Sequence, residues 1–370
     1  MTIPFLDLGA GYFELKDEID AAVARVLESG WYILGREVEA FEAEFALYCE
    51  AKYAVGIGNG LEALLLALKA LGIQPGDEVI VPSNTYIATW LAVSELGAVP
   101  VPVEPRPDTY NIEPAGIEAV IGPRTRAIIA VHLYGQPADL FSIQKIAKRH
   151  GLAVIEDAAQ CIGARYHGAR IGAHSDVVCW SFYPGKNLGA MGDGGAITTN
   201  DGALAERIRM LGNYGSDKKY IHGIKGRNSR LDSIQAAILR VKLAHLDDWN
   251  ARRNVIAARY LDKVSADGVL LPHVPDWAEP VWHLFVIRSD QREGLRDHLT
   301  GVGIGTLIHY PIPPHLQGAY SSDGERRTFS PLPWAERLAQ EVLSLPIGPQ
   351  ARLEDIDMVV YEINNFSARG

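Results

Sequence analysis

Cysteine is scarce in this sequence, with three residues in 370. Cys49, Cys161 and Cys179 are odd in number and widely spaced, so they form neither a disulfide framework nor a C-x-x-C metal-binding pair. The 11 histidines are scattered and contain no H-E-x-x-H or similar ligand pattern. We therefore expect a cytoplasmic protein, kept in a reducing compartment, with no metal ion in its site.

Long apolar runs and clusters of positive charge are also lacking. No run of 18 apolar residues could span a membrane, and the first twenty residues contain no apolar signal core. A total of 35 Lys and Arg against 45 Asp and Glu gives a net charge of −10, without a basic cluster that would suit nucleic acid. We expect neither a membrane nor a nucleic acid as a partner. An anionic substrate would need hydrogen-bond donors within its own site.

The sequence does have ample apolar material for a core. It is 48% hydrophobic and 22% charged, as in an ordinary globular protein. Between residues 53 and 200, segments typical of strands and helices alternate. Helices are expected at 61–71, 85–97 and 139–151, and strands at 53–58, 76–83, 98–104, 125–134, 152–159, 176–182 and 194–200. Apolar strands separated by single helices predict an α/β fold with a mostly parallel sheet covered on both faces.

A second, smaller unit is predicted at the C-terminal end. A long helix at about 231–264 would connect the two domains. Beyond it, the pattern predicts a small α+β domain with helices at 293–301 and 334–344 and strands at 279–288 and 302–310. We place the large domain at residues 1–250 and the small domain at residues 251–370.

One lysine stands in an unusual setting. The segment SFYPGKNLGA, residues 181–190, surrounds Lys186 with small, aromatic and apolar neighbours, and the next charged residue is Asp193. A loop lysine that reaches solvent is the ordinary interpretation. The other is a desolvated amine, whose pKa falls from about 10.4 until it becomes a nucleophile towards aldehydes and ketones. The segment alone leaves both interpretations open.

A glycine-rich turn, GIGNG at 56–60, follows a predicted strand and opens a predicted helix. It lacks the dinucleotide fingerprint, because Leu61 occupies the position of the third glycine and the acidic pair Asp77 and Glu78 precedes the next strand instead of ending it. The free amides and dipole of a helix N-terminus suit a single phosphate group. The turn is either a phosphate site or a purely structural feature.

Polar residues end another predicted strand. The segment VIEDAAQ at 154–160 places Glu156, Asp157 and Gln160 where ligands of α/β sheets bind. A carboxylate buried there either pairs with a cation, such as a protonated pyridine nitrogen, or caps the following segment. This segment by itself does not decide between the two.

Together, a phosphate turn, a strand-end aspartate and a lysine in an apolar loop are the parts that pyridoxal phosphate requires. The lysine forms an imine with the cofactor, the aspartate keeps the ring nitrogen protonated, and the helix terminus holds the phosphate. Tyr86, in SNTYIATW at 83–90, would stack on the ring or pack in the core. The combination predicts a pyridoxal phosphate enzyme.

The chain resembles the sugar aminotransferases of the DegT/DnrJ/EryC1/StrS family over nearly its whole length, from FLDL at 5–8 to HYPIPPHLQGAY at 309–320. The resemblance rests on the motifs GNGLEAL, PSNTYIAT, EDAAQCIGA, SFYPGKNLGAMGDGGA and RNSRLDSIQAA. It implies the aspartate aminotransferase fold (fold type I), pyridoxal 5'-phosphate as cofactor, and a homodimer with shared active sites. Relatives that carry histidine at the lysine position are dehydratases, so the presence of Lys186 implies transamination.

The resemblance also implies roles for single residues. Lys186 would be the imine-forming lysine and proton shuttle. Asp157 would pair with the pyridine nitrogen, Gln160 would bind the ring hydroxyl, and Tyr86 would cover the ring. The phosphate would be held by Ser181, by the turn of Asn59, Gly60 and Leu61, and by Asn228 from the neighbouring subunit. Many members have Ser-Gly-Thr at 59–61, so this chain lacks a hydroxyl ligand there and retains backbone donors.

The expected substrates are L-glutamate and a nucleotide-linked keto sugar. HYPIPPHLQGAY looks most like the segment of members that act at C3 of dTDP-3-oxo-6-deoxyhexoses. The alternatives are amination at C4 of a dTDP-, UDP- or GDP-linked 4-keto sugar, and a non-catalytic sensor or regulator, for which no DNA-reading helix is appended. For the sugar nucleotide we expect contacts from Tyr183, Lys219, Tyr220, His309 and Tyr310.

Overall fold

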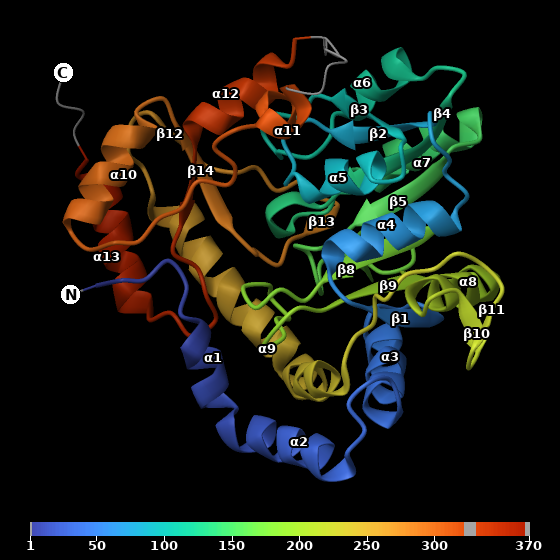
Figure 1. Cartoon of the computed structure of the whole chain (residues 1–370). Helices are drawn as coiled ribbons and strands as arrows, with labels where there is room; N and C mark the ends of the chain where they lie inside the picture. Colours follow the sequence, from blue (N-terminus) through green and yellow to red (C-terminus); the bar gives the residue numbers. More distant parts are fainter. Residues whose placement is uncertain (1, 322–330, 367–370) are drawn as a thin grey trace.

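The computed structural model describes residues 2–321 and 331–366 of the chain (Figure 1). A seven-stranded sheet forms its centre, in the order β1-β9-β8-β5-β4-β2-β3. The strands are β1 (Tyr53–Ile57), β2 (Glu78–Pro82), β3 (Val99–Val103), β4 (Thr125–Val131), β5 (Ala153–Asp157), β8 (Val177–Ser181) and β9 (Gly195–Thr199). Only β9 runs against its neighbours, and the four pairings among β2, β3, β4, β5 and β8 are parallel. The α/β fold and the mostly parallel sheet are confirmed.

Helices cover both faces of this sheet, because alternate residues of its apolar strands point to opposite sides. One face packs against α3 (Arg36–Tyr48), α7 (Leu140–His150) and the first half of α9 (Ser233–Lys263). The other packs against α4 (Gly60–Ala70), α5 (Ala88–Ser94) and α8 (Gly202–Gly212). On β2, Ile80 belongs to the first core, whereas Val79 and Val81 belong to the second.

The small C-terminal sheet has the order β12-β14-β15, with strands β12 (Val269–Leu270), β14 (Phe285–Ser289) and β15 (Val342–Leu345). It packs with α10 (Arg292–Gly301), α13 (Leu353–Asn364) and the second half of α9 around a separate core. The helix α12 (Pro333–Glu341) leads directly into β15. Figure 1 shows α9 running between this unit and the large sheet. The proposed boundary at residue 250 falls inside α9.

Two sequence predictions in this region are wrong. Residues 342–344, expected at the end of a helix, belong to β15 (Val342–Leu345), whose side chains are buried on both faces and so lack the alternation that marks a strand. Residues 302–310, expected as a strand, form only isolated bridges, from Ile304 to Ile3 and from Leu307 to Ser344. This segment divides its hydrogen bonds between the N-terminal residues and β15, so it forms a continuous ladder with neither.

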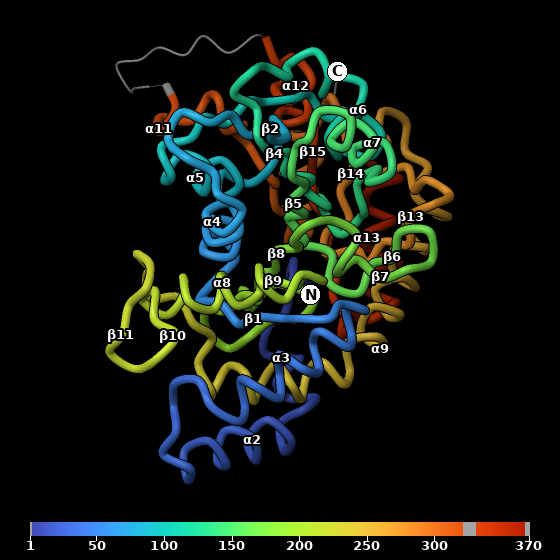
Figure 2. Tube along the Cα trace, turned by 90° about the vertical axis from the view of Figure 1, so that its right-hand side faces the viewer, coloured from blue at the N-terminus to red at the C-terminus, as the bar shows by residue number. Residues whose placement is uncertain are grey.

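The remaining elements lie around these two units. The helices α1 (Leu8–Glu14) and α2 (Lys16–Ser29) lie along α9 at the lower edge of Figure 1. The hairpin of β10 (Ser216–Lys218) and β11 (Ile221–His222) projects from the edge beyond α8 in Figures 1 and 2. Other short elements include α6 (Pro114–Ile117), α11 (Gly318–Ser321), β6 (Arg165–Tyr166), β7 (Ala169–Arg170) and β13 (Ala278–Glu279). No helix among the described residues is both long and apolar enough to cross a bilayer.

Candidate active site

The predicted cofactor residues meet at one edge of the large sheet. Asp157 is the last residue of β5, Ser181 is the last residue of β8, and the turn 58–60 follows β1. These three strands run in the same direction, because β9, which lies between β1 and β8, is antiparallel to both. Their carboxyl ends therefore form one edge, and Lys186 follows Ser181 by five residues.

The turn at 58–60 brings a helix N-terminus against Ser181. Asn59 caps α4, and its Oδ1 accepts a hydrogen bond of 3.0 Å from the amide of Glu62. The amides of Gly60 and Leu61 belong to the first helical turn, where no intrahelical acceptor is available. A Cβ at Gly60 would stand 2.8 Å from Cβ of Ser181, so only glycine allows this approach. Backbone donors and the Ser181 hydroxyl thus form a compact site that suits a phosphate group.

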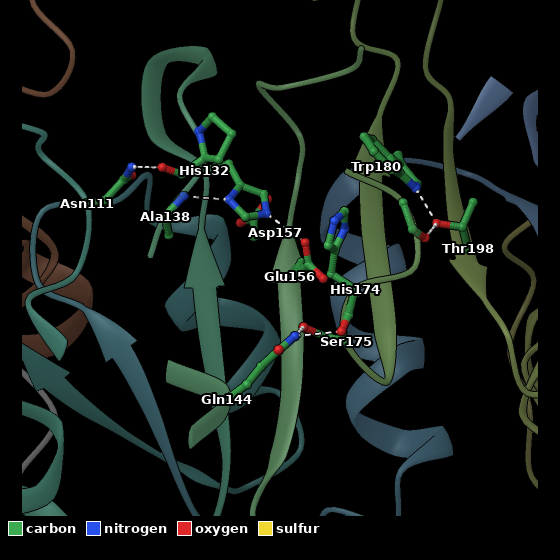
Figure 3. A network of polar contacts seen from close by, with 12 residues as sticks. Asn111, His132, Ala138, Gln144, Glu156, Asp157, His174, Ser175, Trp180 and Thr198 are labelled. Carbon is green, nitrogen blue, oxygen red and sulfur yellow. Dashed lines mark hydrogen bonds and ion pairs between the residues drawn. The ribbon is translucent and has the colours of Figure 1, made fainter. Parts of the chain in front are cut away.

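The two carboxylates of VIEDAAQ point to opposite faces of the sheet. Asp157 is buried; its Oδ2 accepts from Thr89 Oγ1 at 2.9 Å and its Oδ1 from the amide of Ala159 at 3.2 Å. Glu156 is wholly buried, and His132 Nε2 lies 2.9 Å from its Oε2, as Figure 3 shows. Because Nδ1 of His132 accepts from the amide of Ala138, Nε2 carries the ring proton and donates it to Glu156. Glu156 therefore serves the packing of the sheet, and Asp157 is the carboxylate at the site.

Burial shifts the pKa of both principal groups. It raises the pKa of Asp157, and the hydrogen bonds from Thr89 and Ala159 and the charge of Lys186 oppose this shift. It lowers the pKa of the Lys186 amine from 10.5 to about 8, and the charge of Asp157 limits the decrease. The Lys186 side chain is half-buried, and within the described ranges its Nζ has no hydrogen-bond partner. The structure thus supports the desolvated amine over the ordinary surface lysine.

A segment from the small unit closes the site. Gln160 accepts from the amide of Tyr134 at 2.6 Å and donates from Nε2 to the hydroxyl of Tyr310 at 3.1 Å. The Tyr310 ring lies 5.2 Å from that of Tyr86, centroid to centroid. Burial lowers the pKa of His309 to about 4, and the nearby charge of Lys186 contributes. Tyr86, Gln160, His309 and Tyr310 are therefore gathered around Lys186 and Asp157.

Four other predicted residues lie on the surface. Lys219 and Tyr220 form the tip of the β10–β11 hairpin, where Tyr220 is 83% exposed. Tyr183 is 60% exposed, and Asn228 is also exposed. Figure 2 shows the hairpin at the periphery of the molecule. Within one described chain, no contact joins Lys219, Tyr220 or Asn228 to the group around Lys186.

A sequence model described as the DegT/DnrJ/EryC1/StrS aminotransferase family matches residues 14–364. The chain belongs to this family. It is 56% identical over 368 residues, 99% of this chain and 97% of the relative, to the dTDP-3-amino-3,4,6-trideoxy-alpha-D-glucose transaminase of Streptomyces venezuelae. It is 58% identical over 361 residues, 97% and 98% of the two chains, to the erythromycin biosynthesis sensory transduction protein EryC1 of Saccharopolyspora erythraea. The crystal structure of S. venezuelae DesV in complex with a ketimine intermediate superposes with a TM-score of 0.96, at 57% identity and 98% coverage of both chains.

Pyridoxal phosphate is the cofactor of this family, and the residues of this chain fit it. The turn beside Ser181 offers donors to a phosphate, and the buried Asp157, whose pKa is raised, is stabilised as a carboxylate by a cation such as a protonated ring nitrogen. Lys186 supplies a free amine, and Tyr86 and Tyr310 supply aromatic faces. In residues 2–321 and 331–366, no group of three or more His, Cys, Asp or Glu side chains could hold a metal ion.

Reasoning from the sequence missed two residues of this aminotransferase site. Thr89, on α5, orients the Asp157 carboxylate, and His283 has its pKa lowered by burial and by the charge of Lys186. His283 lies just before β14, inside the segment EPVWHLFVIR, and is half-buried. A histidine within an otherwise apolar stretch was the available signal. The hydroxyl of Thr89 gave none, because threonine packs in many helices without any polar role.

Proposed function

We propose that this protein transfers the amino group of L-glutamate to C3 of a dTDP-linked 3-oxo-6-deoxyhexose. The observation that carries the proposal is the half-buried amine of Lys186 beside the buried carboxylate of Asp157. The S. venezuelae relative, named for a dTDP-3-amino sugar, supports the substrate class. Amination at C4 of a dTDP-, UDP- or GDP-linked 4-keto sugar is the second candidate, because the same lysine and aspartate would serve it equally.

When bound, pyridoxal phosphate stabilises negative charge on the carbon that carries the transferred amino group. Asp157 would hold the proton at the ring nitrogen, and Thr89 with the Ala159 amide fixes the orientation of that carboxylate. Lys186 Nζ would remove the proton from the amino-bearing carbon of glutamate, and in the second half-reaction it would supply a proton to the sugar carbon that gains the amino group, since an amine with a pKa of about 8 exchanges protons readily near neutral pH. Gln160 would bind the ring hydroxyl.

The sugar nucleotide would approach between the two units. His309 and Tyr310 lie beside Lys186 and Gln160 and would contact the sugar. Because the net charge is −10, local donors rather than the field of the whole protein would hold the diphosphate. Tyr183, Lys219 and Tyr220 are exposed donors that remain our candidates for this role.

We infer a homodimer in the cytoplasm, with active sites shared between subunits. The exposed positions of Lys219, Tyr220 and Asn228, outside contact with Lys186 of their own chain, support their contribution to a neighbouring subunit's site. Asn228 would then complete the phosphate site of the neighbour. This arrangement gives the surface hairpin a function that its position in one chain does not explain.

A sensor that binds the cofactor without turnover is the competing class, and the name of the S. erythraea relative refers to sensory transduction. A turnover assay separates the two. The purified protein is treated with L-glutamate and then with a panel of dTDP-, UDP- and GDP-linked 3-keto and 4-keto sugars, and the products are identified by mass spectrometry and NMR. We expect an amine at C3 of a dTDP-sugar. Binding of the cofactor without formation of any amino sugar would support the sensor.

A further inference from the structure

The loop that carries Lys186 is attached to the long helix α9 at three points. The amide of Met191 donates to Oε1 of Gln235 at 2.8 Å. Nζ of Lys242 donates to the carbonyl oxygen of Gly189 at 2.7 Å. The side chain of Asn187 donates to Oδ1 of Asn250 at 2.8 Å and to the carbonyl of Val281, also at 2.8 Å. All three attachments follow Lys186 within five residues.

The three helix residues form one polar stripe. At about 100° per residue, positions 235, 242 and 250 lie within about 80° of one another around the helix axis. Lys242 and Asn250 are buried, as is Asn187. The stripe therefore contacts the loop that carries Lys186 within an otherwise apolar interior. Each hydrogen bond there is strengthened by the absence of water.

Burying a lysine such as Lys242 is energetically unfavourable if the side chain only fills space in the core. In the described part of the chain its Nζ bonds only to the Gly189 carbonyl, and burial alone lowers its pKa to about 8. A buried cation without a carboxylate partner destabilises a fold relative to an apolar side chain of similar volume. Its contact, however, fixes a carbonyl three residues from the reactive amine.

We propose that Lys242 and Asn250 are positioning residues for Lys186, holding Gly189 and Asn187 so that the amine stays in its partly desolvated place. The inference rests on the proposed role of Lys186. Neither residue is among those proposed to contact the cofactor or the substrate. Without them, the loop would move and Lys186 would become more hydrated, which raises its pKa towards 10.5.

The test measures the Lys186 amine directly, in cofactor-free protein. Competitive acetylation across a pH series, read by mass spectrometry of the peptide containing Lys186, gives its pKa without glutamate or sugar, so an error about the substrates does not affect it. We expect the pH midpoint of Lys186 acetylation to lie near 8 in the wild type. It should be higher in Lys242→Met and also in Asn250→Leu, a substitution that leaves the net charge unchanged. The matched control is Lys263→Met, which removes an exposed lysine from the same helix and should leave this midpoint unchanged.

Activity adds a second readout. Because small misplacements of a reacting group reduce rates by about 10- to 100-fold, both variants should slow the conversion of bound cofactor by glutamate by at least about tenfold. Calorimetry shows whether each variant is folded. Folded Lys242→Met and Asn250→Leu proteins with lower melting temperatures but a wild-type Lys186 midpoint would overturn the proposal and leave the stripe a stabilising role only. If Lys242→Met does not fold, Asn250→Leu decides alone.

Discussion

Nε2 of Gln160 donates a hydrogen bond of 3.1 Å to the hydroxyl of Tyr310. This contact joins residues 150 positions apart, one just after a strand of the large sheet and one in the segment that leaves α10 of the small unit. The charge of Lys186 contributes to the lowered pKa of the neighbouring His309. Both units therefore line the candidate site, and the proposed roles of the two residues from the small unit can be tested separately from those of the cofactor residues.

We predict that His309→Ala raises the KM for the keto sugar about fivefold to tenfold, the cost of one lost hydrogen bond. Since the pKa of His309 is about 4, its ring is neutral at neutral pH and acts as a polar contact rather than a charge. Steady-state kinetics with the sugar, and stopped-flow spectra with glutamate, separate the two half-reactions. His298→Ala on α10, which removes a histidine paired with Glu362, is the control. Equal damage to both half-reactions would assign His309 to the cofactor or the fold.

Asp157 and Glu156 form a matched pair of test positions on β5. We predict that Asp157→Asn slows the glutamate half-reaction by at least about hundredfold, since loss of one partner of a buried charge pair costs about 3–5 kcal/mol. Glu156→Gln should keep a near-wild-type rate, because its amide oxygen still accepts the proton of His132 on the opposite face. Stopped-flow absorbance measures both. A slow Glu156→Gln with a normal Asp157→Asn would exchange their roles.

The pKa of Lys186 sets the pH dependence of cofactor uptake. A protonated amine cannot attack the aldehyde, so we predict that the rate at which cofactor-free protein captures pyridoxal phosphate rises with pH and levels off above about pH 8. The same rate is measured with Nα-acetyl-lysine, whose amine has an ordinary pKa. This reference reaction shows how ionisation of pyridoxal phosphate itself affects the rate. A protein profile that rises only near pH 10, as the reference should, would mean that Lys186 is fully hydrated.

The large sheet was predictable because its strands are local apolar segments whose alternation with helices dictates the topology. For Lys186 and Asp157 the sequence offered local signals, a lysine among apolar neighbours and a carboxylate at a strand end, whereas the role of Ser181 was implied only by the family resemblance. The small sheet was not predictable, because β15 is buried on both faces and residues 302–310 bond to Ile3 across almost the whole chain. A pattern within a short window contains no information about such a partner.

The same limit applies to Thr89 and Lys242, whose partners are distant in the sequence. Thr89 lies 68 positions from Asp157, and Lys242 lies 53 positions from Gly189. In the sequence, Lys242 looks like any polar residue on a surface helix, and only its burial shows otherwise. Single-chain contacts do not test the predicted roles of Lys219, Tyr220 and Asn228, which concern a neighbouring subunit.

Mixing two inactive variants tests the shared site. Lys186→Ala lacks the amine, and Asn228→Ala lacks the contact proposed to reach the neighbour's phosphate. After random exchange, half of the dimers are mixed and each has one intact site, so we predict recovery of about a quarter of the wild-type rate. Sedimentation should show a dimer before and after mixing. A monomer with full activity, or no recovery in dimers shown to have exchanged, would contradict the shared arrangement.

If Lys186 makes this protein a transaminase, the most direct measurement follows the nitrogen itself. Wild-type protein and Lys186→Ala are incubated with ¹⁵N-labelled L-glutamate, pyridoxal phosphate and a dTDP-3-oxo-6-deoxyhexose, and the label is located by NMR and mass spectrometry. We predict ¹⁵N at C3 of the sugar with the wild type. With Lys186→Ala, whose circular dichroism should remain that of a folded protein, we predict no labelled sugar and no visible absorbance band from lysine-bound cofactor. Transfer of the label by Lys186→Ala at the wild-type rate would contradict this role of Lys186. So would the absence of labelled sugar when cofactor-loaded wild type is tested with all the keto sugars of the panel.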